Sequence, residues 1–223
     1  MLIVIPGVLG SAQLAQVQTL IAQAEFGDGR ATAGSLAARA KDNLQLPLNA
    51  PQMRALQALI GDALALSAEF VAAALPHRLH PALINRYLPG MAFGAHVDNA
   101  VRIDGVPLRA DLAATLFLNA PTDYDGGELA IDSDYGLPDI KGNAGDLVLY
   151  PAGSIHAVRP LTRGRREVAV LWVQSMVRDS GQRRVLYDLD RVIRSLRERA
   201  PDSPEILVLT GIYHNLLRAS VEL

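Results

Sequence analysis

The chain has 223 residues, of which 50% are hydrophobic and 20% charged, so it is long and apolar enough to bury a core. Its net charge of −2 argues against a general nucleic-acid binder, which normally carries a basic excess. It contains no cysteine, which excludes disulfide scaffolds, thiolate zinc sites and iron–sulfur clusters. Any metal in this protein must therefore be held by His, Asp or Glu.

The first third of the chain predicts one short strand and two helices. Residues 2–5 are apolar and of strand length, and a helix is expected from about 12 to 24 with Ser11 as its N-cap. Residues 51–75 carry an apolar face at helical spacing and predict one long helix, which Pro76 ends.

The apolar N-terminus also has to be compared with an export signal. Residues 1–24 carry no charged side chain, but no positively charged segment precedes the apolar stretch, and Pro6 and Gly7 interrupt it. No uninterrupted run of 18 apolar residues exists elsewhere. We therefore expect no export signal, no membrane partner and a cytoplasmic location.

From about residue 80 to 177, short apolar runs alternate with turn signals. Each run has the length of a strand, and no helical pattern lies between them, so parallel βαβ units are not expected. This pattern predicts a jelly roll, in which two antiparallel sheets enclose a pocket. The expected strands cover residues 82–87, 113–118, 129–131, 146–150 and 167–174.

The last part of the chain returns to helical spacing. Apolar residues recur from Val185 to Leu196 with arginines on the other face, and 206–217 predicts a second helix. The fold class is therefore α+β, with N-terminal helices, a jelly-roll core and a C-terminal helical extension. We place the main domain at 1–177 and the extension at 178–223, packed on the barrel or at the subunit interface of a homo-oligomer.

The sharpest chemical feature is His96-Val97-Asp98. Side chains two residues apart on a strand point the same way, so His96 and Asp98 can bind one ion together. A second histidine, His156, follows the end of a strand further along the chain. Two histidines and one carboxylate form the facial triad of non-haem Fe(II) oxygenases. The simpler alternative is a surface histidine beside an acid, which three such residues alone do not exclude.

Arg166 is the fourth residue of this set and lies ten residues after His156. Pro160 and Gly164 indicate a turn between them, so His156 and Arg166 are expected on neighbouring strands. An arginine there can hold a carboxylate through two parallel hydrogen bonds, which suits a dicarboxylate such as 2-oxoglutarate. A surface ion pair is the alternative for this residue.

These motifs make the sequence recognisable. Residues 87–98 (YLPGMAFGAHVD) resemble the iron-binding segment of the prolyl 4-hydroxylase superfamily, and the whole chain resembles the bacterial PKHD-type hydroxylases. The remaining segments that carry this resemblance are 29–34 (GRATAG), 41–45 (KDNLQ), 109–112 (RADL), 115–118 (TLFL), 124–129 (YDGGEL), 145–151 (GDLVLYP), 154–156 (SIH), Arg166 and 209–217 (LTGIYHNLL).

The resemblance implies a double-stranded β-helix (jelly-roll) core, with Fe(II) bound by His96, Asp98 and His156. It also implies 2-oxoglutarate anchored by Arg166, ascorbate as reductant, and dioxygen-dependent hydroxylation that releases succinate and CO2. In some prolyl hydroxylases a tyrosine also contacts the far carboxylate; that position here is Phe117, so Tyr87 or Thr115 is expected to supply the hydroxyl.

Several roles remain open at this level. A non-catalytic jelly-roll binding module and a cupin-like metalloenzyme that ignores 2-oxoglutarate are the alternatives to an oxygenase. Nothing in the residues selects a peptide over a small-molecule substrate. Trp172 is interpreted as a core residue, and Arg109 as one half of a salt bridge with Asp111 or with a neighbouring strand, in preference to a residue that orients substrate or cosubstrate. Residues 29–34 and 41–45 are interpreted as either the active-site mouth or scaffold.

Overall fold

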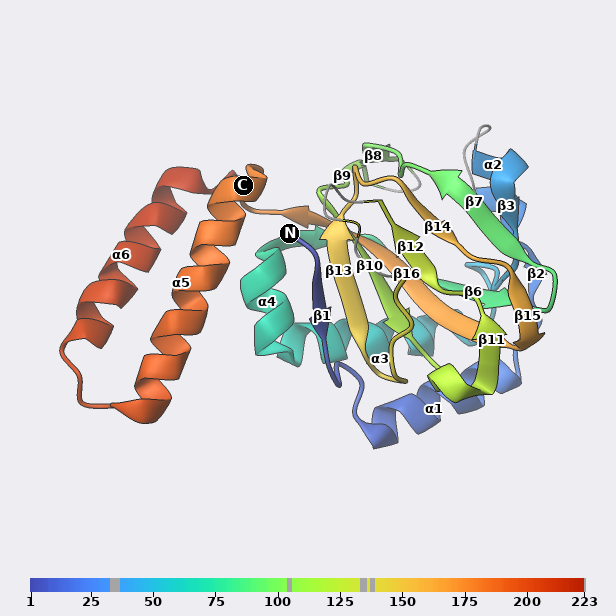
Figure 1. The fold of residues 1–223 in the computed structure, drawn as a ribbon, viewed down its shortest axis with the longest axis horizontal. Helices are drawn as coiled ribbons and strands as arrows, with labels where there is room; N and C mark the ends of the chain where they lie inside the picture. The colour runs from blue at the N-terminus through green and yellow to red at the C-terminus, as the bar shows by residue number, and fades with distance from the viewer. Residues whose placement is uncertain (33–36, 104–105, 133–135, 137–138, 223) are drawn as a thin grey trace.

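The computed structural model describes residues 1–32, 37–103, 106–132, 136 and 139–222. Residues 33 and 34 of the 29–34 motif, and the last residue of the C-terminal extension, lie outside this part. Two antiparallel sheets face each other, helices cover the outer face of the larger sheet, and a helical hairpin lies at one end of the molecule (Figure 1). This arrangement is the predicted α+β jelly roll.

The larger sheet collects strands from both ends of the sequence. Its order is β1-β13-β10-β16-β6-β4-β2, and β5 pairs with the far part of β16. The strand bounds are β1 Ile3–Ile5, β2 Gly27–Asp28, β4 Leu44–Gln45, β5 Pro76–Leu79, β6 Leu83–Tyr87, β10 Leu112–Phe117, β13 Leu147–Pro151 and β16 Arg166–Ser175. The strands predicted after residue 80 are confirmed to within about two residues. Five shorter strands from before residue 80 also take part: four belong to the larger sheet and one, β3, to the smaller.

The smaller sheet has the order β12-β14-β7-β3 and lies opposite the centre of the larger one. Its strands are β3 Lys41–Asp42, β7 Ala92–His96, β12 Leu129–Ile131 and β14 His156–Val158. Two further strand pairs flank it: β11 Tyr124–Gly126 with β15 Leu161–Gly164, and β8 Val101–Arg102 with β9 Leu108–Arg109.

Strand β16 shows how side-chain alternation separates the core from the cavity. Ala169, Leu171 and Val173 belong to the hydrophobic cluster under the helices. The alternate positions, from Arg166 to Trp172, line a cavity between the two sheets. One strand therefore supplies both a wall of the core and the floor of the candidate site.

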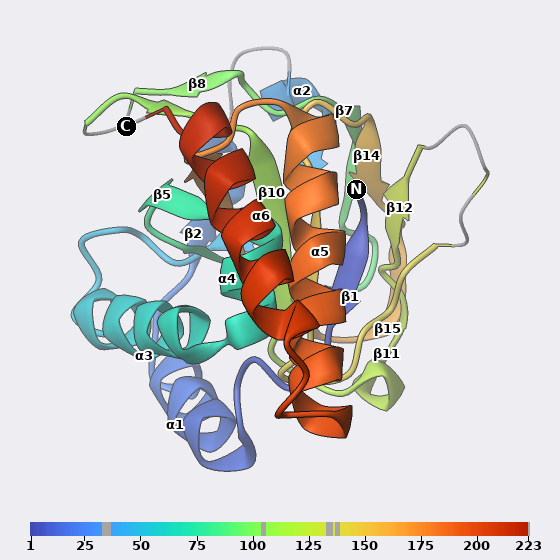
Figure 2. The same cartoon turned by 90° about the vertical axis from the view of Figure 1, so that its left-hand side faces the viewer.

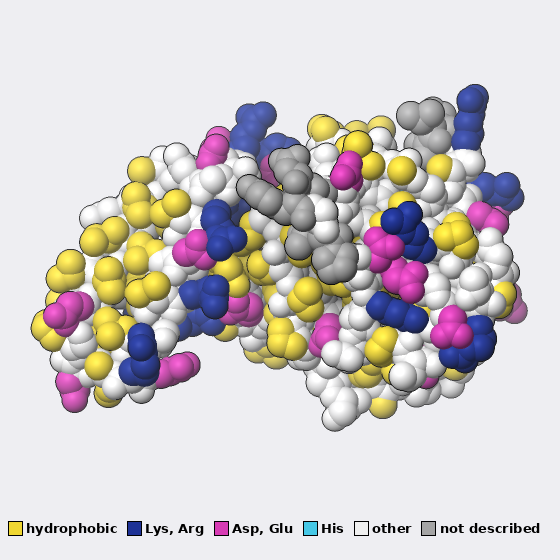
Figure 3. All heavy atoms as spheres, in the orientation of Figure 1, with side chains coloured by type: hydrophobic (Ala, Val, Ile, Leu, Met, Phe, Trp, Pro, Cys, Tyr) yellow, Lys and Arg dark blue, Asp and Glu magenta, His cyan; other side chains and the backbone are white. Residues whose placement is uncertain are grey.

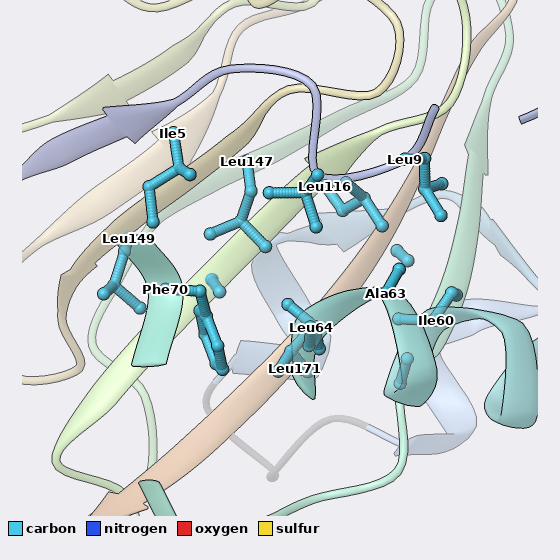
Figure 4. Close-up of a cluster of buried hydrophobic side chains, with 14 of the residues drawn as sticks. Ile5, Leu9, Ile60, Ala63, Leu64, Phe70, Leu116, Leu147, Leu149 and Leu171 are labelled. Atoms are coloured by element: carbon cyan, nitrogen blue, oxygen red, sulfur yellow. The ribbon is translucent and has the colours of Figure 1, made fainter. Parts of the chain in front are cut away.

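The N-terminal helices cover the outer face of the larger sheet. They are α1 Ser11–Ala22, α3 Met53–Leu66 and α4 Ala68–Ala74, and Figure 4 shows side chains of α3 and α4 against those of the sheet. The prediction of one helix over 51–75 is wrong: the helix breaks at Ser67, whose Oγ accepts a hydrogen bond from the backbone N–H of Phe70 and caps α4. The N-cap of α1 is Gly10 rather than Ser11, and Gln13 accepts the Gly10 N–H.

Three short helical segments complete the main body: the 3-10 turns η1 Gly29–Thr32 and η2 Pro121–Asp123, and α2 Ala37–Ala40. In the described part of the chain no single helix has the length and hydropathy of a membrane span. Helices α3 and α4 reach that hydropathy only when taken together, across a bend of 82°.

The C-terminal hairpin consists of α5 Ser180–Arg199 and α6 Glu205–Ser220, as the sequence predicts (Figure 2). Helix α5 packs against α4, where Glu69 accepts hydrogen bonds from Tyr187 and Arg194. A bridge between Val177 and Val221 closes the base of the hairpin. The boundary at 177/178 stays a prediction.

Candidate active site

A cavity opens between the two sheets and gathers all the residues singled out for chemistry. Its floor comes from β16, β10, β6 and β13, and its roof from β7, β14, β12 and β3. The polar and aromatic residues that line it are Lys41, Asn85, Tyr87, Phe93, His96, Asp98, Asn99, Arg102, Thr115, Tyr150, His156, Arg166 and Trp172.

The two histidines form a cross-strand pair. His96 on β7 lies opposite His156 on β14, and their ring centroids are 4.2 Å apart. Asp98 lies two residues beyond the end of β7, with its Oδ1 4.0 Å from His96 Nε2 and its Oδ2 3.8 Å from His156 Nε2. One ligand atom from each residue can be chosen so that all three lie within 4.8 Å of one another. The sequence spacing thus brings the three side chains together from two adjacent strands.

Hydrogen bonds orient both imidazoles for ligation. The Nδ1–H of His96 donates to the carbonyl oxygen of Gly94 at 2.9 Å, and that of His156 donates to Ser154 at 3.0 Å. Each Nε2 therefore carries the lone pair, which is the arrangement that metal-binding histidines adopt. Burial, together with the nearby His156, lowers the pKa of His96, which favours the neutral, ligating form.

The donor set fits an Fe(II) ion. Asp98 Oδ2 is buried and has no hydrogen-bond partner among the described residues, although two imidazole nitrogens face the carboxylate. An unpartnered buried carboxylate oxygen is costly unless a cation meets it. Two neutral imidazoles and one carboxylate are the ligands of non-haem Fe(II) oxygenase sites.

Arg166 is a buried cation with no anionic partner among the described residues. It is 1% exposed, and none of its three guanidinium nitrogens has a hydrogen-bond partner in the described part of the chain. Its Cζ lies 5.2 Å from the ring centroid of Tyr87, which is opposite it on β6, and 5.6 Å from that of Phe117. Such an arrangement is expected where a ligand supplies the missing carboxylate.

The relative placement of the strands that carry His156 and Arg166 differs from the sequence prediction. The two residues do not lie on neighbouring strands: β14 belongs to the smaller sheet and β16 to the larger, and β15 lies between them in the chain. They face the same cavity from opposite sheets, which places a cavity between the metal ligands and the arginine.

Two tyrosines lie near Arg166, and Thr115 lies further along the cavity floor, where β10 places it opposite Val170. Tyr87 and Thr115, the two sequence candidates, both line the cavity. The sequence analysis missed Tyr124, whose buried hydroxyl has no hydrogen-bond partner among the described residues. Burial raises the pKa of Tyr124, and the charge of the nearby Arg166 opposes that rise. Its sequence signal is the 124–129 segment (YDGGEL), which begins with this tyrosine. Both glycines of that segment have positive φ, and a Cβ added at Gly127 would lie 2.9 Å from Cδ of Arg166.

The structure also places Arg109, Trp172 and the 41–45 segment, whose roles the sequence left open or assigned to the scaffold. Arg109 pairs with Asp111 at 2.8 Å, as expected. Trp172 is buried, also as expected, but it lines the cavity as well, and Arg102 lies over its ring. Lys41, the first residue of the 41–45 segment, lines the cavity too, so this segment borders the site.

Comparison with known proteins agrees with this geometry. Residues 82–174 match the 2OG-Fe(II) oxygenase superfamily, and residues 180–222 match the PKHD-type hydroxylase C-terminal domain. The chain is 51% identical over 223 residues to a PKHD-type hydroxylase of Xanthomonas campestris pv. campestris, and 51% identical over 222 residues to one of Burkholderia lata, with 98% of each chain covered in both cases. The crystal structure of a Pseudomonas putida prolyl-4-hydroxylase shares the fold, with a TM-score of 0.53 at 20% identity over 78% of this chain and 92% of that chain.

Proposed function

Because the chain belongs to the PKHD-type hydroxylases of the 2OG-Fe(II) oxygenase superfamily, we propose that the cluster of His96, Asp98 and His156 holds its Fe(II). The protein is a 2-oxoglutarate- and Fe(II)-dependent hydroxylase. Family membership decides against the binding-module and cupin-like alternatives. The single observation that carries the ligand assignment is the convergence of two oriented Nε2 atoms on the Asp98 carboxylate, whose Oδ2 has no hydrogen-bond partner among the described residues.

Arg166 anchors the far carboxylate of 2-oxoglutarate in this proposal. Its guanidinium is buried at the end of the cavity and offers parallel N–H donors, which match a carboxylate in pairs. The hydroxyls of Tyr87 and Thr115 line the same cavity and supply further donors.

An Fe(II) ion held by His96, Asp98 and His156 would supply, with dioxygen and 2-oxoglutarate, the oxidising power for hydroxylation, and 2-oxoglutarate would be converted to succinate and CO2. The protein holds the reactants and excludes water around them. Phe93 stacks on His96 at 3.7 Å between ring centroids, and Tyr150 packs edge-on against His156 at 5.1 Å. These rings hold the imidazoles in place and keep the surroundings of the metal site apolar.

The test uses metal and cosubstrate binding as well as turnover. Calorimetry with Ni(II) should show one binding site in the wild type. His96→Ala, Asp98→Ala and His156→Ala should each lower the affinity for Ni(II) by more than about tenfold. His214→Ala, at an exposed histidine on α6, is the matched control and should bind as the wild type does. Anaerobic Fe(II) with 2-oxoglutarate should give a visible absorption band, and oxygen should then release succinate. Unchanged metal binding in the triad variants contradicts the ligand assignment.

Ascorbate, which the family resemblance suggests as reductant, is also proposed here. Adding it during turnover should raise the amount of succinate formed before the enzyme loses activity. No increase, with Fe(II) in excess, contradicts this role. A cytoplasmic location stays a prediction of the sequence.

We also propose that the α5–α6 hairpin meets a second copy of the chain. Leu207, Val208, Ile212 and Leu216 on α6 are 40–79% exposed, and apolar side chains gather over the hairpin in Figure 3. Residues 206–217 contain no Asp, Glu, Lys or Arg, so two copies of α6 can pair there without juxtaposing like charges. Light scattering should show a dimer that Leu207→Glu converts to a monomer; a wild-type monomer contradicts the proposal.

A further inference from the structure

Arg166 has an unpartnered neighbour, the hydroxyl of Tyr124. The Tyr124 side chain is 0% exposed, and its hydroxyl has no hydrogen-bond partner among the described residues, as is also true of the three guanidinium nitrogens of Arg166. Buried polar groups are normally hydrogen-bonded, so each group left without a partner needs an explanation. Two such groups side by side point to one ligand that satisfies both.

The two side chains meet at Gly127. A Cβ added at Gly127 would lie 2.9 Å from Cδ of Arg166 and 3.4 Å from Cε2 of Tyr124, so both side chains border the same point. The charge of Arg166 also acts on the phenol: burial raises the pKa of Tyr124, and the guanidinium opposes that rise. Because the net shift is upward, the phenol keeps its proton at neutral pH and can donate it in a hydrogen bond.

The Tyr124 ring is fixed in place by its surroundings. Its strand, β11, pairs with β15. Lys141 Nζ donates a hydrogen bond to the Tyr124 carbonyl oxygen at 2.6 Å and lies 4.3 Å from the centroid of the ring. Tyr124 also belongs to the same buried cluster as Tyr87 and Val158, both of which line the cavity. The hydroxyl is therefore held at the Arg166 end of the cavity before any ligand binds.

The guanidinium alone cannot satisfy this hydroxyl. Arg166 carries only N–H donors, so the phenol oxygen can accept from it, but the phenol proton still requires an acceptor. A carboxylate has two oxygens with about four acceptor positions, so it can accept two parallel N–H bonds and the O–H bond together. One carboxylate would thus give a partner to both groups.

The other side chains near Arg166 are less well placed to donate to such a carboxylate. The Phe117 ring has no donor. Tyr87 presents its ring to the guanidinium, and although burial raises its pKa, Arg166 and the Asn43 amide oppose that rise, so its hydroxyl has a protein amide nearby. Thr115 pairs with a residue of β16 four positions beyond Arg166, about 13 Å along the strand.

From this juxtaposition we propose that Tyr124 is a cosubstrate-binding residue, whose hydroxyl donates to the same far carboxylate of 2-oxoglutarate that Arg166 holds. The inference rests on the proposed function, which places that carboxylate at Arg166. It adds to the anchor a donor from the β11–β15 pair, which flanks the smaller sheet. Without the cosubstrate both groups stay buried and unpartnered, and binding removes that cost from each of them.

The test is Tyr124→Phe in the full-length protein, because phenylalanine keeps the ring and removes only the hydroxyl. Calorimetry of 2-oxoglutarate with the Ni(II)-loaded variant should give a dissociation constant about ten- to a hundredfold above that of the wild type, as expected for the loss of a hydrogen bond to a charged group. Tyr213→Phe, on α6 and outside the cavity lining, is the matched control and should bind as the wild type does.

Two further measurements separate cosubstrate binding from a structural role. In urea unfolding of the metal-free protein, Tyr124→Phe should be at least as stable as the wild type, because it no longer buries an unpartnered hydroxyl. 2-Oxopentanoate has the carbon chain of 2-oxoglutarate but lacks the far carboxylate. Its affinity, followed by the visible band of the anaerobic Fe(II) protein, should change by less than about threefold in Tyr124→Phe.

Three results would overturn the inference. The first is that Tyr124→Phe binds 2-oxoglutarate within about threefold of the wild type, and the second is that it loses affinity for 2-oxopentanoate to the same extent as for 2-oxoglutarate. The third is a metal-free Tyr124→Phe protein less stable than the wild type, which would show that the hydroxyl has a partner in the unliganded protein.

Failure of this inference is distinguishable from failure of the proposed function. If Arg166→Met weakens 2-oxoglutarate binding and Tyr124→Phe does not, the proposed anchor stands and only the role of Tyr124 falls. If neither variant weakens binding, the anchor assignment falls together with this inference. If the Ni(II)-loaded wild type does not bind 2-oxoglutarate at all, the proposed function itself falls.

Discussion

Replacing Arg166 by methionine separates binding of 2-oxoglutarate from stability of the fold. Methionine keeps much of the apolar length of the side chain and removes the charge. In the wild type the guanidinium is 1% exposed and has no hydrogen-bond partner among the described residues. Its neighbours are the rings of Tyr87 and Phe117, which a thioether can also pack against. The unliganded protein therefore loses little that stabilises it.

The magnitudes follow from this burial. Removing one partner of a buried charge pair costs about 3–5 kcal/mol, because the other charge stays buried without its counter-ion. At about 1.4 kcal/mol per tenfold, the dissociation constant for 2-oxoglutarate should rise by two to four orders of magnitude. The free energy of unfolding without ligand should stay within about 1 kcal/mol of the wild type or increase, since apolar replacements of buried ions are often stabilising.

Two measurements check this prediction. Calorimetry of 2-oxoglutarate with the Ni(II)-loaded protein gives the affinity, and urea unfolding of the metal-free protein gives the stability. Arg165→Met is the matched control, because that neighbouring arginine is 55% exposed and pairs with Glu167 at 3.4 Å. If Arg166→Met bound 2-oxoglutarate within about threefold of the wild type, the anchor assignment would be refuted. A large loss of stability would refute the reasoning that the guanidinium awaits a ligand.

Three further predictions follow from local geometry. Gly127→Ala should cost at least about 1–2 kcal/mol of stability and weaken 2-oxoglutarate binding in the same assays, because φ is +67° and a Cβ would lie 2.9 Å from Cδ of Arg166, the proposed anchor. Gly153→Ala, with open space around it, should change neither quantity. Because the pKa of Lys41 falls from 10.5 to about 8 in the folded state, the unfolded chain binds more protons between these values, so stability should rise with pH across that window, and Lys41→Met should abolish the rise in denaturant titrations at several pH values. Glu69 joins α4 to α5; burial raises its pKa, but hydrogen bonds from α5 outweigh that effect and hold the pKa below 4.5. The contact should therefore stabilise the hairpin above about pH 4.5, and this stabilisation should be lost as pH falls through the folded pKa. Glu69→Gln should speed amide exchange in α5 at neutral pH, and unchanged exchange would show that this contact does not hold the hairpin.

The sequence determined the local parts of this protein. Apolar runs of strand length located β6, β10, β12, β13 and β16, because alternation along a strand depends only on which residues face the core. The His-x-Asp spacing placed two candidate ligands together for the same local reason. The wrong helix over 51–75 has a local cause too: a capping hydroxyl at Ser67 interrupts an apolar pattern that continues through it.

The tertiary structure decided which distant residues share the cavity. Arg166 and His156 face each other from different sheets, a relation that spacing along the chain misrepresents, because the sheet to which a strand belongs depends on pairing with remote strands. Tyr124 comes from a flanking strand, and Trp172 and Lys41 come from the floor and the roof of the cavity. The sequence marked the segments that hold Tyr124 and Lys41, but only the packing of the sheets brings them to this site. The sequence thus carried the ligand chemistry, and the packing of two sheets placed Arg166 across one cavity from the candidate metal ligands.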